Sequence, residues 1–146
     1  MRLSTKGRYA VMAMADLARH GGDRAVSLAE IAARQDISLS YLEQLFARLR
    51  RKGLVKSARG PGGGYRLAAP AEQTSVGAIV VAVDEPLKVT RCAAAGVLGC
   101  MPNGEQCVTH HLWEELGAHI QDFLDGVSLS DVLARRYGAG AEPVAA

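Results

Sequence analysis

Apolar residues recur every three or four positions near the start of the chain, which is the spacing of a helix with one buried face. This pattern predicts a first helix over residues 6–20, capped by Thr5 and ended by the glycine pair 21–22. Residues 27–30 read Ser-Leu-Ala-Glu, which is a capping box. A second helix should therefore begin there and end near Gln35.

A third helix is predicted over residues 39–52, with Ser38 as its cap and Gly53 as its stop. The turn 36–38 separates it from the second helix and should bury Ile37, so the pair forms a helix-turn-helix. Its inward stripe is apolar and consists of Leu42, Leu45, Phe46 and Leu49. Its outward face is polar early and basic late, and carries Ser40, Tyr41, Glu43, Gln44, Arg48, Arg51 and Lys52. A recognition helix needs base-reading groups early and phosphate-binding cations late, although a solvated helix can look similar.

A β-hairpin is predicted directly after this helix. Residues 54–58 alternate as a short strand, a glycine-rich tip follows over 59–64, and alternation resumes at Tyr65 and Leu67. Such a hairpin projects basic residues in the way the wing of a winged helix does. Glycine-rich loops also bind nucleotide phosphates, but no Lys-Ser/Thr pair follows here and no helix opens, so a P-loop is not favoured.

The segment 75–84 is ambiguous in its pattern. Its β-branched residues favour a strand by propensity, whereas Ser75 as a cap and apolar positions 76, 79, 80 and 83 favour a helix. We predict a short helix that follows a linker over 70–74 and ends at Glu85-Pro86.

A long amphipathic helix is predicted over residues 109–126. Its apolar stripe consists of Leu112, Trp113, Leu116, Ile120, Phe123, Leu124 and Val127. The stripe is large for so small a domain to cover, so we interpret it as a dimerisation helix; packing against its own domain is the alternative. Residues 128–131 should cap a brief last helix.

Charge is distributed unevenly along the 146 residues. Residues 1–66 hold 13 Lys/Arg and 5 Asp/Glu, whereas residues 67–146 hold 4 and 10. A basic half attracts a polyanion such as DNA, although solvated charged faces are common. The N-terminus lacks an apolar signal core, and no apolar run reaches the roughly 20 residues of a membrane span. We therefore expect a cytoplasmic protein with no membrane partner, whose thiols stay reduced.

The three cysteines Cys92, Cys100 and Cys107 lie in one loop, and His110 follows closely. An odd number of cysteines argues against a simple disulfide framework. Three thiolates and an imidazole form a complete ligand set, and these residues alone leave structural zinc and an iron–sulfur cluster open. His111 is a rival to His110. No Cys-x-x-Cys spacing or general-base constellation is present, so we do not expect an enzyme.

Four parts of the chain resemble the IscR-type iron–sulfur cluster regulators. They are MRLSTKGRYA at residues 1–10, ISLSYLEQLF at 37–46, RGPGGGY at 59–65, and the loop ends TRC at 90–92 and CVTH at 107–110. The resemblance runs from residue 1 to about 133. It implies a homodimeric winged-helix regulator with a 2Fe–2S cluster.

The resemblance also implies which residues bind. The cluster ligands would be Cys92, Cys100, Cys107 and His110. The residues at DNA-contacting positions would be Ser38, Ser40, Tyr41, Glu43, Gln44, Arg59 and Gly60, and Glu43 would restrict the cluster-free protein to one class of DNA site. The cysteines of the family are typically separated by five and five residues, whereas seven and six separate them here. A glycine-containing loop can absorb three extra residues at little cost.

These patterns and the resemblance predict a mainly α fold with a small β-hairpin. We expect a winged helix-turn-helix domain over 1–84, a cluster-binding loop over 85–111, a dimerisation helix and short C-terminal helix over 112–137, and a disordered tail over 138–146. The expected function is regulation of iron–sulfur cluster biogenesis genes, mainly as a repressor and at other promoters as an activator. Cluster occupancy would set the preference among pseudo-palindromic sites on double-stranded DNA. The alternatives are a nitric-oxide or redox sensor of the same fold with a different cluster, and a structural zinc site.

Overall fold

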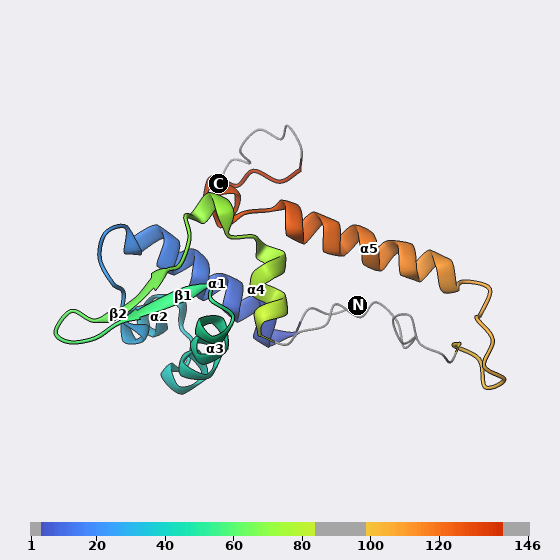
Figure 1. The fold of residues 1–146 in the computed structure, drawn as a ribbon, viewed down its shortest axis with the longest axis horizontal. Helices are drawn as coiled ribbons and strands as arrows, with labels where there is room; N and C mark the ends of the chain where they lie inside the picture. The colour runs from blue at the N-terminus through green and yellow to red at the C-terminus, as the bar shows by residue number, and fades with distance from the viewer. Residues whose placement is uncertain (1–3, 84–98, 139–146) are drawn as a thin grey trace.

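The computed structural model describes residues 4–83 and 99–138. Its elements in chain order are α1 (Thr5–Gly21), α2 (Leu28–Gln35), α3 (Leu39–Arg51), β1 (Val55–Ala58), β2 (Gly64–Leu67), the 3₁₀ turn η1 (Ala71–Gln73), α4 (Val76–Ala82), α5 (His110–Gly126) and α6 (Leu129–Ala134). The first four helices, the hairpin and α6 gather together, and α5 extends away from them (Figure 1). The predicted helix end at 85–86, Cys92 and residues 139–146 lie outside the described residues. Among the described helices, none is both long and apolar enough to span a membrane.

Helix α1 begins one residue earlier than the sequence pattern predicts. Ser4, not Thr5, is its cap: the Ser4 hydroxyl accepts a hydrogen bond from the Lys6 amide at 3.2 Å. Ser4 has the extended backbone that a cap requires, while Thr5 is already helical. The prediction of Thr5 as the cap is therefore wrong.

The capping box at the start of α2 is confirmed. The Ser27 hydroxyl accepts from the Glu30 amide at 3.2 Å, and the Glu30 carboxylate accepts from the Ser27 amide at 2.9 Å. The Ser27 amide and then the Arg24 guanidinium stabilise the charged carboxylate and lower the pKa of Glu30 to about 2.

The turn between α2 and α3 has the predicted length and anchor. Asp36 takes the left-handed conformation with φ of 52°, and Ile37 is 5% exposed. Ser38 then caps α3 by accepting from the Tyr41 amide at 3.2 Å. Gly53 ends the helix with φ of 77°, which favours glycine.

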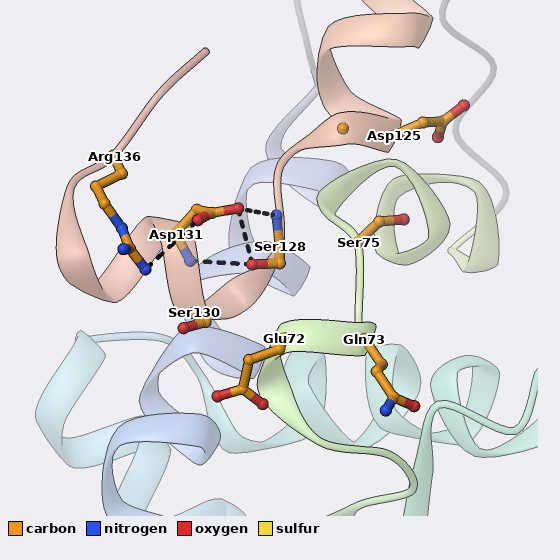
Figure 2. A pocket seen from close by; sticks show the side chains of 9 residues that line it. Glu72, Gln73, Ser75, Asp125, Ser128, Ser130, Asp131 and Arg136 are labelled. Atoms are coloured by element: carbon orange, nitrogen blue, oxygen red, sulfur yellow. Dashed lines mark hydrogen bonds and ion pairs between the residues drawn. The ribbon is translucent and has the colours of Figure 1, made fainter. Parts of the chain in front are cut away.

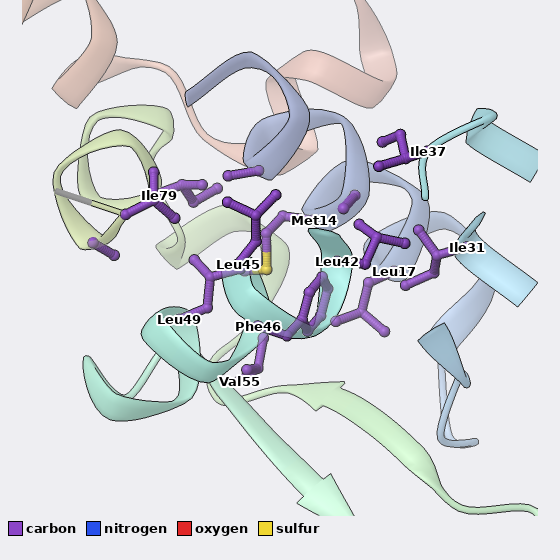
Figure 3. Close-up of a cluster of buried hydrophobic side chains, with 14 of the residues drawn as sticks. Met14, Leu17, Ile31, Ile37, Leu42, Leu45, Phe46, Leu49, Val55 and Ile79 are labelled. Carbon is purple, nitrogen blue, oxygen red and sulfur yellow. The ribbon is translucent and has the colours of Figure 1, made fainter. Parts of the chain in front are cut away.

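The core lies between α1, α2 and the inward face of α3 (Figure 3). The four residues of the predicted α3 stripe are each no more than 1% exposed, which confirms them as core. The ring of Phe46 packs edge-on against Tyr65 of β2, with 4.9 Å between centroids. This contact fixes the hairpin against the helix that precedes it.

The predicted hairpin is confirmed, and it is joined by a third segment. β1 and β2 pair antiparallel. Val26, just before α2, exchanges two backbone hydrogen bonds with Tyr65, at 3.0 and 2.8 Å. A side chain at Gly64 would collide with the Val26 carbonyl, so this close approach requires glycine.

Residues 76–82 form a helix rather than a strand, as predicted. Ser75 caps α4 by accepting from the Ala78 amide at 3.1 Å. The C-terminal segment returns to this point, because the Val76 amide donates to the Val127 carbonyl at 2.8 Å. Leu129 of α6 is then 0% exposed within the same core as α1. The segment 70–74, predicted as a linker, contains η1.

Helix α5 is the element least covered by the described residues. None of its own residues is buried. Four side chains of the predicted stripe are 36–60% exposed, namely Leu112, Trp113, Leu116 and Phe123. The C-terminal end of the stripe packs against α4, because Val127 is 5% exposed and Leu124 lies against the same cluster. The described part of the chain does not cover the rest of the stripe.

Candidate nucleic-acid interface and metal-ligand loop

The N-terminal turns of α3 place a group of polar side chains on the surface. Ser40, Glu43 and Gln44 are exposed, as the outward-face prediction requires. The Ser38 hydroxyl is engaged as the helix cap. Tyr41 is half-buried and meets the ring of Tyr9 edge-on at 6.0 Å. This ring contact ties the start of α3 to α1 and positions the exposed residues beside it.

Arg48 does not belong to the outward basic face, which corrects the sequence prediction. It is half-buried, and its Nη1 donates to the carbonyl of Val83 at 3.0 Å. Arg50, which the outward-face prediction omitted, is exposed beside Arg51 and Lys52. The C-terminal end of α3 is therefore basic, as predicted, but Arg50 takes the place of Arg48 in it.

The hairpin places the two predicted wing residues at an exposed tip. Arg59 and Gly60 are both exposed. Gly60 has φ of 94°, and its carbonyl accepts from the Gly63 amide at 2.9 Å, so the tip is a tight glycine turn. A Cβ at Gly63 would lie 2.6 Å from the Ala58 carbonyl oxygen. The glycines therefore serve the turn and leave Arg59 projecting from it.

A buried ion pair that the sequence reading missed fixes α2 against α1. The Asp16 side chain is 0% exposed; Arg34 donates to it from Nε at 3.0 Å and from Nη2 at 2.8 Å, and Gln35 at 2.8 Å. Burial raises the pKa of Asp16, but the Arg34 and Gln35 hydrogen bonds outweigh it, so the pKa is lowered. The detectable signal was a carboxylate beside Ala13 and Leu17 on the apolar side of the first helix.

The cysteine loop brings two of the four predicted ligands into contact. The Sγ of Cys100 lies 3.1 Å from Nδ1 of His110, and the Cys107 amide donates to the same sulfur at 3.5 Å. The Sγ of Cys107 instead lies 3.6 Å from the Thr109 hydroxyl. Cys92 lies outside the described residues. Cys100 and Cys107 are both half-buried free thiols.

The two neighbouring histidines have different surroundings. The His110 side chain is 13% exposed, whereas that of His111 is 80% exposed. His110 turns its other nitrogen, Nε2, toward the Glu114 carboxylate at 4.0 Å, and His111 lies 3.4 Å from that carboxylate. Among the described residues, these three side chains are close enough together to hold a metal ion. Of these three, His110 is the one whose ring lies against a cysteine sulfur within the described residues.

A polar hollow of about 370 Å³ lies between η1, the cap of α4, the end of α5 and α6 (Figure 2). Three of its lining residues, Ser128, Asp131 and Arg136, pair with one another. Asp131 accepts from the Ser128 amide at 3.0 Å and lies 3.8 Å from Arg136. The hydrogen bonds between Ser128 and Asp131 form the capping box of α6.

Helix-turn-helix, recognition helix and glycine-tipped hairpin together define a winged-helix DNA-binding protein. Residues 3–135 match the Rrf2 family, described as iron-dependent transcriptional regulators, and the chain belongs to this family. Its mainly helical fold with one hairpin is confirmed, and the protein is a DNA-binding transcriptional regulator rather than an enzyme.

Two relatives are the HTH-type transcriptional regulators IscR of Erwinia tasmaniensis and Sodalis glossinidius, each 53% identical. The alignments cover 91% and 92% of this chain and 79% of each relative. Among solved structures, IscR of T. potens is 42% identical with a TM-score of 0.73, over 91% of this chain and 86% of that one. CymR, the global cysteine regulator of B. subtilis, is 32% identical with a TM-score of 0.75, over 90% and 95%.

Proposed function

We propose that this regulator senses a 2Fe–2S cluster held by Cys92, Cys100, Cys107 and His110, and that cluster occupancy sets its preference among DNA sites. The observation that carries the proposal is the 3.1 Å approach of the Cys100 sulfur to His110 Nδ1. The family description as iron-dependent and the relatives named IscR support it.

The donor set fits such a group. With metal–sulfur and metal–nitrogen bonds of about 2.3 and 2.0 Å, two ligands of one tetrahedral ion lie about 3.5 Å apart. The Cys100–His110 separation is close to this value, so small shifts would let both bind one metal. The Cys107 amide that donates to Cys100 would help to stabilise its thiolate. When bound, the cluster would supply redox-active iron whose gain and loss follow iron supply.

His110 would coordinate through Nδ1, because that nitrogen faces the sulfur. Its Nε2 would then face the Glu114 carboxylate, and a carboxylate at the far nitrogen orients a ligating imidazole.

The cluster test is metal analysis of anaerobically purified protein. We expect an iron–sulfur absorption spectrum and two irons with two sulfides per chain. Cys100→Ala and His110→Ala should lose the cluster faster, and the matched control His111→Ala should retain it. One zinc per chain without sulfide would overturn the cluster and favour a structural zinc site. Four irons and four sulfides would favour the nitric-oxide or redox sensor.

The exposed stripe of α5 supports a homodimer. Leu116 and Phe123 are 36% and 50% exposed, and large apolar patches mark interaction sites. Sedimentation should show a dimer at micromolar concentration that Phe123→Glu weakens. Ala118→Glu, at an exposed position on the opposite side of the same helix, is the control and should leave the dimer intact. A stable monomer in the unmodified protein would contradict this proposal.

A dimer of winged helices would bind pseudo-palindromic sites with half-sites about one helical turn, or a multiple, apart. Gln44→Ala should relax base preference, at a cost of about 1–3 kcal/mol for a lost bidentate contact. Arg59→Ala should weaken all sites through the wing. If Gln44→Ala leaves relative affinities unchanged across single-base variants of a site, Gln44 does not read bases.

Within this proposal, the main targets are iron–sulfur biogenesis genes under repression, with activation at other promoters. Glu43 would determine which class of DNA site the cluster-free protein binds. A carboxylate accepts from cytosine N4 but repels phosphates and guanine acceptors. Glu43→Ala should therefore let the cluster-free protein bind sites that it otherwise rejects. Equal affinity and site preference with and without the cluster would overturn the switch.

A further inference from the structure

The first residue of the recognition helix is a leucine that the core does not use. Leu39 is 44% exposed, whereas the other three leucines of α3 are at most 1% exposed. Single exposed apolar side chains are common on protein surfaces, so exposure alone decides nothing. The position of Leu39 at the start of α3, however, suggests a function for this exposed side chain.

Leu39 stands at the end of α3 that a helix-turn-helix inserts into the major groove. Side chains on a helix lean toward its N-terminus, so a side chain at the first position reaches past the end of the helix. Leu39 is followed by the exposed Ser40 and lies one turn before Glu43, on one side of the exposed face. It is an apolar group at the edge of a polar reading surface.

In the major groove, the apolar group that distinguishes one base from the others is the C5-methyl of thymine. Contact with it would bury both apolar surfaces at once. We propose that Leu39 is a specificity-determining residue that contacts the C5-methyl group of one thymine in each half-site. The inference rests on α3 being the base-reading helix, as proposed above.

Burial of one methyl group against Leu39 corresponds to about a fourfold change in affinity per half-site. Replacing thymine by deoxyuridine removes this methyl and keeps base pairing. A site selected in vitro with the full-length protein would be scanned in this way, one symmetry-related thymine pair at a time. Affinities would be measured for the unmodified protein, Leu39→Ala, and the control Val81→Ala, which trims an exposed apolar side chain of α4.

We expect one thymine pair whose demethylation weakens the unmodified protein and Val81→Ala by about fifteenfold, while Leu39→Ala is nearly insensitive to it. Equal melting temperatures would show that Leu39→Ala folds. No sensitive pair, or the same sensitivity in all three proteins, would overturn the role of Leu39. If Gln44→Ala changes base preference while Leu39 shows no coupling to a methyl, only this inference fails. If neither residue affects base preference, the inference about Leu39 and the proposed base-reading role of Gln44 both fail.

Discussion

Replacement of Arg48 should test whether the recognition helix is tied to the segment that leads into the cysteine loop. Arg48 Nη1 donates to the carbonyl of Val83, the last described residue before residues 84–98. Hydrogen bonds with a charged partner contribute about 1.5–3 kcal/mol. Arg48 is only half-buried, so the lower end, about 1.5 kcal/mol, applies. Arg48→Met keeps the apolar stem and removes this bond.

The matched control is Arg50→Met, which removes the same charge from an exposed position of α3. Urea unfolding at one fixed protein concentration should show a loss of about 1.5 kcal/mol for Arg48→Met and less than about 0.5 kcal/mol for the control. Arg48→Met should also reduce the ratio between the DNA affinities of the iron-loaded and the iron-free protein, by up to about tenfold. A single contact cannot change this ratio by more than its own interaction energy allows. Equal effects of the two variants on stability and on this ratio would refute the reasoning.

Three further outcomes follow from the packing. Leu129→Ala should lower the free energy of unfolding by about 2–5 kcal/mol, because the side chain is fully buried; an effect near zero would mean that α6 does not pack on α1. The pKa of Asp16 is lowered from 3.8 by Arg34 and Gln35 against burial, so its charge stabilises the fold above that pH and this stability is lost as the pH falls through the lower folded pKa. The difference in unfolding free energy between the unmodified protein and Asp16→Asn should therefore shrink on acidification. A constant difference would mean that the charged Asp16 does not stabilise the fold through Arg34 and Gln35. Gly64→Ala should separate β2 from Val26, so the protection of the Tyr65 amide against hydrogen exchange should fall while that of the Leu129 amide is unchanged. Unaltered protection at Tyr65 would contradict the close approach.

Helix starts were predictable because a cap is a local interaction. Ser27, Ser38, Ser75 and Ser128 each accept a hydrogen bond from the backbone amide three residues ahead, so each signal lies within four residues of sequence. Thr5 shows the limit of such signals. Ser4 and Thr5 are adjacent hydroxyl residues that can both cap a helix, with a modest preference for serine, and the extended backbone at Ser4 makes it the cap.

Contacts between distant residues were not predictable in this way. Helical spacing gives the direction of a side chain around its own helix but not what lies opposite. Arg48 lies near the edge of the outward face of α3, and its side chain donates to the Val83 carbonyl at the end of α4, 35 residues later. The Asp16–Arg34 pair spans 18 residues, and its partner could not be named from periodicity alone.

The cysteine loop shows how local and distant constraints combine. The spacing from Cys107 to His110 is fixed, because the His110 amide donates to the Cys107 carbonyl at 3.0 Å as α5 begins. The stretch from Cys100 to Cys107 is longer than is typical of the resembled family, yet it folds back on itself: the Gly99 amide donates to the Gly104 carbonyl at 3.1 Å, and the Met101 amide to the Glu105 carbonyl at 3.0 Å. A side chain at Gly99 would collide with the Glu105 carbonyl, so this return requires glycine. Extra residues in such a hairpin lengthen its tip without separating its ends, and the Cys107 amide still reaches the Cys100 sulfur. For the proposed ligands Cys100 and Cys107, spacing along the chain is therefore a weaker constraint than the geometry of the turn that joins them.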